Sequence, residues 1–293
     1  IIEVPSPNLS GNEILIESSI SLISSGTDRM LQEFGKSSIF NKALQQPERV
    51  KDVLNKAKTD GIYETFDAVQ NKINNPIKLG YSNVGTIIDK GDLVKDFAIG
   101  DMVICNGSHA ELNSVSSNLC AKIPKNVNEE EAVFTVLGSI ALQGIRLVKP
   151  TLGESFLVSG LGLIGLLTCQ LLKINGCKVF GIDPDSSKCN LAEKLGIKSC
   201  TQIDNVISWC NKNNNGNLCD GVIISASTKS NNPIEIASKI TRKKGRIILI
   251  GSTGIDIRRD NFYNKELTFK VSCSYGPGRY DQNYEDKGID YPI

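Results

Sequence analysis

The chain has 293 residues, enough for two domains that each bury a sizeable core. Its 33 Lys and Arg residues nearly balance its 32 Asp and Glu residues, so no net field attracts nucleic acid or an anionic membrane, and we expect neither as a partner. A hydrophobic fraction of 40% and a charged fraction of 22% are typical of a globular protein rather than a disordered one.

Cysteine usage bears on the cellular compartment. The nine cysteines include no C-x-x-C pair, which argues against both a disulfide framework and a four-cysteine zinc lobe. The first residues, Ile1 to Pro5, show neither the basic nor the apolar segment of a signal peptide. We therefore expect reduced thiols and a cytoplasmic location. Because the sequence starts without Met and stops abruptly at Ile293, we also expect it to be a fragment.

The first part of the chain, residues 1–125, is rich in predicted strands. Two β-branched runs, 13–17 and 18–23, are bounded by glycines and predict two short strands. Apolar residues at helical spacing then predict a helical insert at about 42–75. Further strands are predicted at Val84–Ile88, Met102–Cys105 and Leu119–Ile123.

After Pro124, apolar strands alternate with helical patterns up to residue 272. The predicted strands are 155–159, 177–183, 221–225 and 246–250, and the predicted helices are about 163–175, 186–195 and 231–243. This alternation predicts an α/β domain over 126–272, with a doubly wound parallel sheet covered by helices on both faces. Residues 273–293 would begin a truncated C-terminal segment, and Asn211–Asn217 is a loop by composition.

Two segments of this domain invite other interpretations. Ser155–Leu172 is uncharged over 18 residues, the lower limit for a membrane span, but its glycines and hydroxyl residues favour a buried strand followed by a buried helix. The basic run Lys239–Arg246 could suggest nucleic-acid binding. We interpret it instead as a helix C-terminus capped at Gly245, where cations complement the helix dipole.

A glycine-rich turn, Gly160-Leu161-Gly162-Leu163-Ile164-Gly165, lies between a predicted strand and a predicted helix. The first glycine permits a tight turn, the second lets the backbone approach a pyrophosphate, and the third lets the helix pack closely on the strand. The backbone N–H groups at the start of the helix would then bind the phosphates. We predict that all six residues contact a dinucleotide.

Asp183 ends the next predicted strand, 18 residues after Gly165. A carboxylate there can accept hydrogen bonds from the adenosine ribose hydroxyls and repel a 2′-phosphate, so we expect NAD(H) in preference to NADP(H). Asp183 could instead cap the helix that begins near Ser186, a role that Asp185 could share. Lys188 could lie at the adenosine edge or simply be an exposed helix lysine.

Small residues follow the next two strands of the sheet. Ser225 and Ala226 follow one strand, and Gly251 and Ser252 follow the other. At the carboxyl edge of a parallel sheet, small side chains let the ribose and nicotinamide approach the backbone. The same residues could also be ordinary turns, and both interpretations stay open.

The order of these parts resembles the medium-chain dehydrogenase/reductase superfamily, the alcohol dehydrogenase-like proteins. The matching segments are Gly11–Ile16, Ser25–Asp28, Gly80–Gly85 and Val94–Val103, so the likeness extends over nearly the whole chain. The resemblance implies a GroES-like β-barrel substrate domain in front of a Rossmann domain, and hydride transfer between a nicotinamide cofactor and a small-molecule substrate.

The zinc ligands of this superfamily are replaced in the present sequence. Ser25 stands where zinc-dependent members have Cys, Tyr81-Ser82 where they have His-Glu, and Gly138 near where they commonly have another Cys. Neutral hydroxyls and glycine are poor zinc ligands, so we expect no zinc. The only histidine, His109, cannot build a site by itself, and we expect it to be a loop or barrel residue.

Segments 21–28, 79–82 and 274–280 further resemble two-part oxidoreductases of cell-surface polysaccharide and sugar metabolism. In those proteins a sugar dehydrogenase-like half, of the glucose–fructose oxidoreductase type, follows the alcohol dehydrogenase-like half. The resemblance implies that this chain is the N-terminal half of such a protein, with a covalently continuous C-terminal oxidoreductase half as its partner.

The leading hypothesis is an NAD(H)-dependent, zinc-independent oxidoreductase acting on a carbonyl or alcohol, with sugars and sugar derivatives among the candidates. Without a metal, a hydroxyl must polarise the substrate oxygen, and by resemblance Tyr81, Thr27 and Ser25 occupy the cleft. Tyr81 ranks first because a phenol is the strongest acid of the three, although it could merely line the cleft.

Two other functions stay open at this point. A catalytically degenerate NAD(H)-binding module could support the attached half, and a zinc-free quinone or enoyl reductase would also fit, although such reductases often use NADP(H). A strand near Leu267–Ser272 could join two copies in a homodimer.

Overall fold

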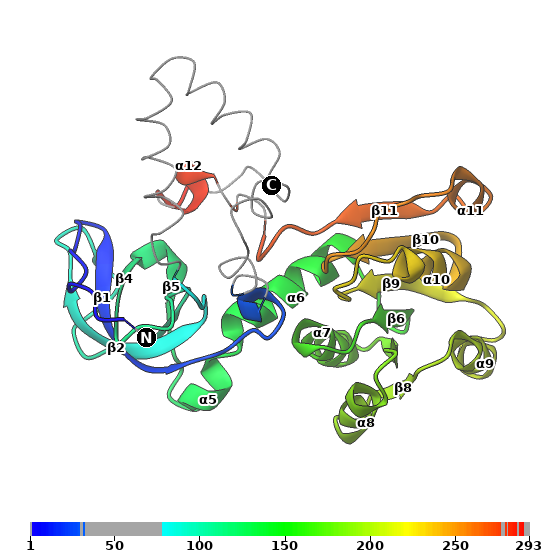
Figure 1. Cartoon of the computed structure of the whole chain (residues 1–293), viewed down its shortest axis with the longest axis horizontal. Coiled ribbons are helices and arrows are strands. Elements are labelled where there is room, and N and C mark those ends of the chain that lie inside the picture. Colours follow the sequence, from blue (N-terminus) through cyan, green and yellow to red (C-terminus); the bar gives the residue numbers. More distant parts are fainter. Residues whose placement is uncertain are drawn as a thin grey trace, which may run out of the picture.

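The structure is a computed structural model that describes residues 2–29, 32, 78–276, 279, 281–285 and 287–289. These residues form two sheets, one antiparallel and one parallel, which lie on either side of the long helix α6 (Thr135–Val148) in Figure 1. The predicted helical insert at 42–75 lies outside the described residues.

The first sheet is antiparallel, with five strands in the order β4-β1-β2-β3-β5. Its strands are β1 (Glu13–Ser21), β2 (Asn83–Lys90), β3 (Met102–Cys105), β4 (Leu112–Ser116) and β5 (Cys120–Lys122), with a 3₁₀ turn at Ser117–Leu119. The expectation of two strands within residues 13–23 was wrong, because both runs belong to β1. Irregular register with β2 at Leu15/Ile16 and at Ser18/Ile20 explains the interrupted pattern.

The second sheet is parallel throughout, with six strands in the order β11-β10-β9-β6-β7-β8. Its strands are β6 (Ser155–Ser159), β7 (Lys178–Ile182), β8 (Lys198–Cys200), β9 (Cys219–Ile224), β10 (Thr241–Leu249) and β11 (Thr268–Val271). The chain starts at β6, builds outward to β8, and then returns to the other side of β6 with β9. That reversal creates a crevice at the carboxyl edge between β6 and β9, where open α/β sheets bind ligands.

Helices cover both faces of this sheet, as predicted (Figure 1). One face carries α6, α7 (Leu163–Ile174) and α8 (Ser186–Lys194), and the other carries α9 (Ile203–Asn213) and α10 (Asn232–Ile240). Alternate residues of β6 divide between the two cores, since Leu157 packs on the α9/α10 face while Phe156 and Val158 pack on the α6/α7 face. The doubly wound α/β architecture is therefore confirmed.

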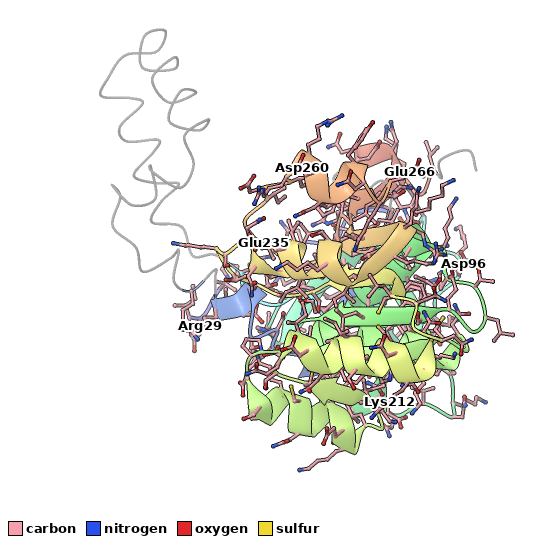
Figure 2. The ribbon with its side chains drawn as sticks, turned by 90° about the vertical axis from the view of Figure 1, so that its right-hand side faces the viewer. Arg29, Asp96, Lys212, Glu235, Asp260 and Glu266 are labelled. Atoms are coloured by element: carbon pink, nitrogen blue, oxygen red, sulfur yellow. The ribbon has the colours of Figure 1, made fainter. Side chains whose placement is uncertain are left out.

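The solvent-facing sides of these helices are charged. Figure 2 shows Lys212 of α9 and Glu235 of α10 at the molecular surface, where both side chains are exposed. On the inner side of α9, Val206, Trp209 and Cys210 are buried at spacings of three and four residues. α9 therefore extends into the Asn-rich stretch, and only Asn214–Asn217 of the predicted loop lies beyond the helix.

The predicted helix over 231–243 is too long, because α10 ends at Ile240 and Thr241 already begins β10. The capping role assigned to Gly245 was therefore wrong, since Gly245 lies within β10. The end of α10 is instead capped by the side chain of Lys265, whose Nζ donates to the carbonyls of Ser238, Lys239 and Thr241 at 2.8–2.9 Å.

The uncharged stretch 155–172 is divided between β6 and α7, as predicted. Among the helices that the structure describes, none combines the length and the apolar character needed to span a bilayer. Further short helices are α5 (Glu129–Ala132), α11 (Arg259–Tyr263) and α12 (Gln282–Glu285), and residues 27–29 are also helical.

Candidate functional site

The glycine turn between β6 and α7 has two tightly packed glycines and one open glycine. Gly160 has a φ of +97°, and a Cβ there would lie 2.6 Å from the backbone nitrogen of Ala226. A Cβ on Gly165 would overlap the carbonyl oxygen of Gly160, whereas a Cβ on Gly162 would meet no atom within 4 Å. Gly160 and Gly165 therefore shape the turn, and Gly162 leaves free space in front of it.

The start of α7 offers hydrogen-bond donors to this free space. Gly162 is the N-cap residue, and it has no side chain that could accept from the first N–H groups of the helix. These N–H groups and the positive end of the helix dipole favour an anion such as a pyrophosphate. The turn predicted from the sequence thus has the geometry of a phosphate-binding turn, with Leu161, Leu163 and Ile164 supplying its intervening backbone.

The small residues after β9 and β10 pack directly against this turn. The backbone N–H groups of Ser225 and Ala226 donate to the carbonyl of Ser159 at 2.8 and 3.1 Å, and Ser225 Oγ donates to the carbonyl of Gly160 at 2.7 Å. Ser252 N in turn donates to the carbonyl of Ala226 at 3.0 Å. A Cβ on Gly251 would overlap this same carbonyl, so the close packing of the loops requires small residues.

Asp183 follows β7 directly and is only 4% exposed. Its Oδ2 accepts a hydrogen bond from Leu161 N at 2.8 Å, and its Oδ1 accepts one from Asp185 N at 3.0 Å. The N-cap of α8 is Asp185, whose carboxylate accepts from Ser187 N at 2.9 Å. Asp185, and not Asp183, therefore caps α8. The Asp183 carboxylate instead faces the glycine turn.

Lys188 on the first turn of α8 lies beside this carboxylate. Its Nζ is 3.6 Å from Asp183 Oδ2, and its side chain is half exposed. Because the ammonium group is 3.6 Å away and its side chain is half exposed, this ion pair contributes little to stability. It does place one positive and one negative charge together at the outer end of the glycine turn.

Two buried hydroxyls near the carboxyl edge of the sheet are unsatisfied. Thr253 Oγ1 and Ser272 Oγ are buried and have no hydrogen-bond partner among the described residues. Ser272 comes directly after β11, and Thr253 lies beyond β10. A buried hydroxyl without a partner costs about 1–3 kcal/mol, so a ligand amide or hydroxyl that reached either group would be favoured. Sequence reasoning missed Ser272, whose only signal is its place after the edge strand.

The three predicted catalytic residues lie on two segments that hydrogen bonds join. Ser25 is exposed, while Thr27 and Tyr81 are half-buried. Gly80 N donates to Asp28 Oδ1 at 3.2 Å, and Leu22 N donates to the carbonyl of Ser82 at 3.0 Å. These bonds hold the 22–28 segment, whose last two residues begin a helical turn, against the 80–82 segment, so the candidates share one neighbourhood.

His109 belongs to the same neighbourhood, which sequence reasoning did not foresee. It lies in the loop between β3 and β4, as expected, but its Nε2 is 3.5 Å from Asp28 Oδ2 and its Nδ1 is 2.9 Å from Ser21 Oγ. The imidazole ring packs directly on Gly80, where φ is +87° and a Cβ would lie 2.6 Å from the ring. No local sequence signal could connect Ser21 with His109, because they are 88 positions apart.

The donor atoms in this neighbourhood do not fit a zinc ion. Ser82 Oγ donates to the carbonyl of Val133 at 2.6 Å, and the carboxylate of Asp28 already accepts from Ser24 N at 2.7 Å and from Gly80 N. Gly138, on α6, offers no side-chain donor. Nowhere in the described part of the chain do three or more His, Cys, Asp or Glu side chains gather as a metal site would need.

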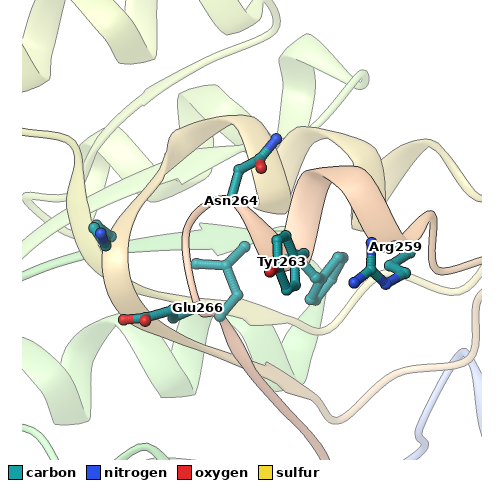
Figure 3. Close-up of a pocket in the computed structure, with 7 residues that line it drawn as sticks. Arg259, Tyr263, Asn264 and Glu266 are labelled. Carbon is teal, nitrogen blue, oxygen red and sulfur yellow. The ribbon is translucent and has the colours of Figure 1, made fainter.

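A surface hollow of about 650 Å³ lies elsewhere, at α11 (Figure 3). Its walls include Tyr263, Arg259 and Glu266, and the guanidinium of Arg259 lies 4.1 Å from the centre of the Tyr263 ring. None of the predicted cofactor or catalytic residues lines this hollow. Its mixture of cationic, anionic and aromatic groups indicates no particular ligand.

Comparison with known proteins extends these observations. Residues 164–286 match the protein-family model described as zinc-binding dehydrogenase. The chain is 34% identical to the D-guloside 3-dehydrogenase of Escherichia coli over 127 residues, which are 42% of this chain and only 36% of that relative. It is 24% identical to a probable D-xylulose reductase A of Neosartorya fischeri over 248 residues, which are 71% of this chain and 69% of the relative.

Solved structures share the same fold at lower sequence identity. The galactitol-1-phosphate dehydrogenase of Escherichia coli superposes with a TM-score of 0.69 at 18% identity, covering 93% of this chain and 79% of that one. The 2R,3R-butanediol dehydrogenase of Bacillus subtilis superposes with a TM-score of 0.71 at 17% identity, covering 99% of this chain and 85% of that one. Both support the arrangement of an antiparallel sheet followed by a six-stranded parallel sheet.

Proposed function

We propose that the chain is a member of the medium-chain dehydrogenase/reductase superfamily and an NAD(H)-dependent oxidoreductase acting on a carbonyl or an alcohol, in keeping with its matches to dehydrogenases. The observation that carries the proposal is the turn Gly160–Gly165, which combines free space at Gly162 with an uncapped helix start. A bound nicotinamide would accept or donate the hydride.

The chain's own residues would hold the cofactor in three places. The backbone N–H groups of the glycine turn would bind the pyrophosphate. Asp183 has lone pairs beyond those used by Leu161 and Asp185, so its carboxylate can still accept from ribose hydroxyls. The unsatisfied hydroxyls of Thr253 and Ser272 would bind polar groups near the carboxyl edge of the sheet.

The preference for NAD(H) over NADP(H) also rests on Asp183. A carboxylate repels a 2′-phosphate, and Asp183 is held in place by two backbone N–H groups. Lys188, at 3.6 Å, offsets part of this repulsion. We therefore expect discrimination between the cofactors, but not complete exclusion of NADP(H).

A sugar or sugar alcohol is the substrate class that we favour. The names of several relatives specify a guloside, xylulose or a galactitol phosphate. In this chain Ser25, Thr27 and Tyr81 would present three hydroxyls to a polyhydroxylated substrate. Tyr81 would polarise the reacting oxygen, and the reaction would proceed without zinc.

A second function has one specific observation in its favour. The replacement of the zinc donors by Ser25, Tyr81 and Gly138 would also suit an NAD(H)-binding module without chemistry of its own. Such a module would support an attached oxidoreductase half. Both functions require cofactor binding, and only the first requires turnover.

The test combines metal analysis, calorimetry and a substrate panel on the purified full chain. We expect less than stoichiometric zinc, NADH binding at least about tenfold tighter than NADPH binding, and oxidation of at least one panel member. The panel contains xylitol, galactitol, galactitol 1-phosphate, a methyl guloside and butane-2,3-diol. Turnover that a chelator abolishes and zinc restores would refute zinc independence, and NADH binding without any turnover would favour the module.

A further inference from the structure

We infer that Ser21, His109 and Asp28 form a proton relay that serves the hydroxyl cluster of Ser25, Thr27 and Tyr81. The inference rests on the oxidoreductase function proposed above and adds a route for the proton. Neither the resemblance nor the family comparison assigns a role to His109.

The chemistry of the three side chains fixes the direction of the relay. The Asp28 carboxylate can only accept hydrogen bonds, so the nitrogen that faces it at 3.5 Å, His109 Nε2, carries the proton in the neutral ring. The other nitrogen, Nδ1, then has a lone pair and accepts from Ser21 Oγ at 2.9 Å. A neutral imidazole in this tautomer can take up a proton on Nδ1.

Backbone hydrogen bonds hold the Asp28 carboxylate in place. Its side chain is 9% exposed, and its two oxygens accept from Ser24 N at 2.7 Å and Gly80 N at 3.2 Å. A buried carboxylate with two backbone donors stabilises an adjacent imidazolium when His109 takes up a proton. The 3.5 Å separation is long for a hydrogen bond, as relay contacts often are before substrate binds.

The ring of His109 is held by its backbone as well as by its two partners. His109 N donates to the carbonyl of Leu79 at 2.7 Å, and the ring packs on Gly80 in the space that a Cβ would fill. Asn83 Nδ2 donates to the carbonyl of Ser108 at 3.1 Å and fixes the preceding residue. The imidazole is therefore positioned before any ligand arrives.

The relay adjoins the predicted catalytic residues at each of its ends. Asp28 follows Thr27 directly, and Gly80, on which the ring packs, precedes Tyr81. Ser21 pairs with Asn83 across β1 and β2, and the next residue, Leu22, bonds to Ser82. All three relay residues thus belong to, or contact, the segments that carry the hydroxyl cluster.

The proposed proton transfer balances with the hydride transfer. In alcohol oxidation a bound oxidised nicotinamide would supply the hydride acceptor, and the O–H proton would pass through the hydroxyl cluster to Ser21 Oγ. Ser21 passes its own proton to His109 Nδ1, and the resulting imidazolium is stabilised by Asp28. Because Nε2 is buried, the imidazolium would later release the proton from Nδ1, and the side chain as a whole is 23% exposed. Reduction runs the same steps in reverse.

Histidine ¹⁵N NMR tests the relay without a substrate, because the chain has a single histidine. In the 293-residue chain labelled at histidine, we expect the neutral ring to be the Nε2–H tautomer. The Asp28→Asn variant should shift the tautomer population, while Asp101→Asn, at a surface ion pair with Lys122, should not. A neutral ring protonated on Nδ1 in the wild type would overturn the relay, whether or not the protein proves to be an enzyme.

Steady-state kinetics test the role of His109 in proton transfer, with whichever compound of the substrate panel the wild type oxidises. We expect His109→Gln and His109→Ala to lower kcat roughly 100-fold, with KM within about threefold and NADH affinity unchanged. Added imidazole should restore part of the activity of His109→Ala, an effect that a merely structural role would not produce. Ser21→Ala should also lower kcat, whereas the matched variant Ser114→Ala on β4 should not. Near-normal kcat with an unaltered pH profile in folded His109→Gln would overturn the inference.

Discussion

The backbone N–H of Leu161 donates a 2.8 Å hydrogen bond to the carboxylate of Asp183. The residue predicted to select the cofactor therefore also holds the loop predicted to bind its pyrophosphate. Because one side chain is expected to do both, a variant at position 183 can weaken cofactor binding by removing a charge, by releasing the loop, or by both. Different substitutions separate these effects.

Substitution of Asp183 should weaken NADH binding in two steps. Asp183→Asn keeps an oxygen that can accept from Leu161 N but removes the charge, so we expect about tenfold weaker NADH binding and a smaller preference over NADPH. Asp183→Ala also releases the loop, and its affinity should fall further, with about 1–3 kcal/mol of lost stability. Calorimetry and thermal unfolding measure both quantities.

Asp185→Asn is the control for this pair, because Asp185 caps α8 and has no predicted contact with the cofactor. It should alter stability by about 1 kcal/mol at most and leave NADH affinity unchanged. Wild-type NADH affinity in Asp183→Ala would contradict the assignment of Asp183.

Alanine at the second and third glycines of the turn should give opposite results. Gly162 has a φ of −72° and open space around its Cβ position, so Gly162→Ala should fold normally and bind NADH at least about tenfold more weakly. Gly165→Ala would place a Cβ on the carbonyl oxygen of Gly160 and should lower the melting temperature. If Gly162→Ala bound NADH as the wild type does, the pyrophosphate would not sit on this turn.

Removal of the Tyr81 hydroxyl should slow turnover without affecting cofactor binding. We expect Tyr81→Phe to lower kcat by about 100-fold, since a positioned acid contributes on that order. The matched variant is Tyr263→Phe on α11, which lines the hollow that contains none of the predicted site residues. Steady-state kinetics measure kcat for both variants. A wild-type kcat in Tyr81→Phe would show that Tyr81 only lines the cleft and has no catalytic role.

Asp220 should make stability depend on pH in the acidic range. Burial raises the pKa of Asp220, but hydrogen bonds from Ser155 and Arg242 outweigh this effect and hold the pKa below its usual value. Its contribution to stability is therefore fully present above about pH 4 and is lost as the pH falls through the lowered pKa. Asp220→Asn should cost about 1–3 kcal/mol at pH 7.

The stability gap between wild type and Asp220→Asn should narrow as the pH falls below about 4. Urea unfolding at several pH values measures it. Asp92→Asn, at an exposed position, serves as the control and should show no such trend. A gap of constant size across this range would contradict the charge-based explanation.

The strands of the parallel sheet could be predicted where the local residue pattern matched the structure that the segment adopts. β6 is a continuous apolar run followed by a glycine turn, and its predicted bounds are those observed. β8 has only three residues, two of them polar, and gave no signal. The start of β10 carries Arg242, Lys243 and Lys244, which made it resemble a helix end. What stops α10 is Lys265, a contact across more than twenty residues that no local pattern reveals.

The candidate site likewise has one part that the local sequence predicted and another part that depends on long-range contacts. The glycine turn and Asp183 lie within one strand–helix–strand unit, so their spacing alone predicted that they would serve the same dinucleotide, but not the hydrogen bond between Leu161 and Asp183. The Asp28–His109 pair depends on the pairing of β1, β2 and β3, which brings distant loops together. The sequence therefore predicted the geometry of the candidate nucleotide-binding turn, but Tyr81 was ranked without knowledge of the side chains that surround it.

The close fit of Gly160 against Ala226 has a consequence for anyone who wishes to redesign cofactor choice. Since even one methyl group at position 160 would collide with the neighbouring loop, the inner part of the turn tolerates no variation in size. At the outer end of the turn, by contrast, the Lys188 side chain is half exposed. Engineering of NADP(H) specificity should therefore begin on α8 and leave the glycines untouched.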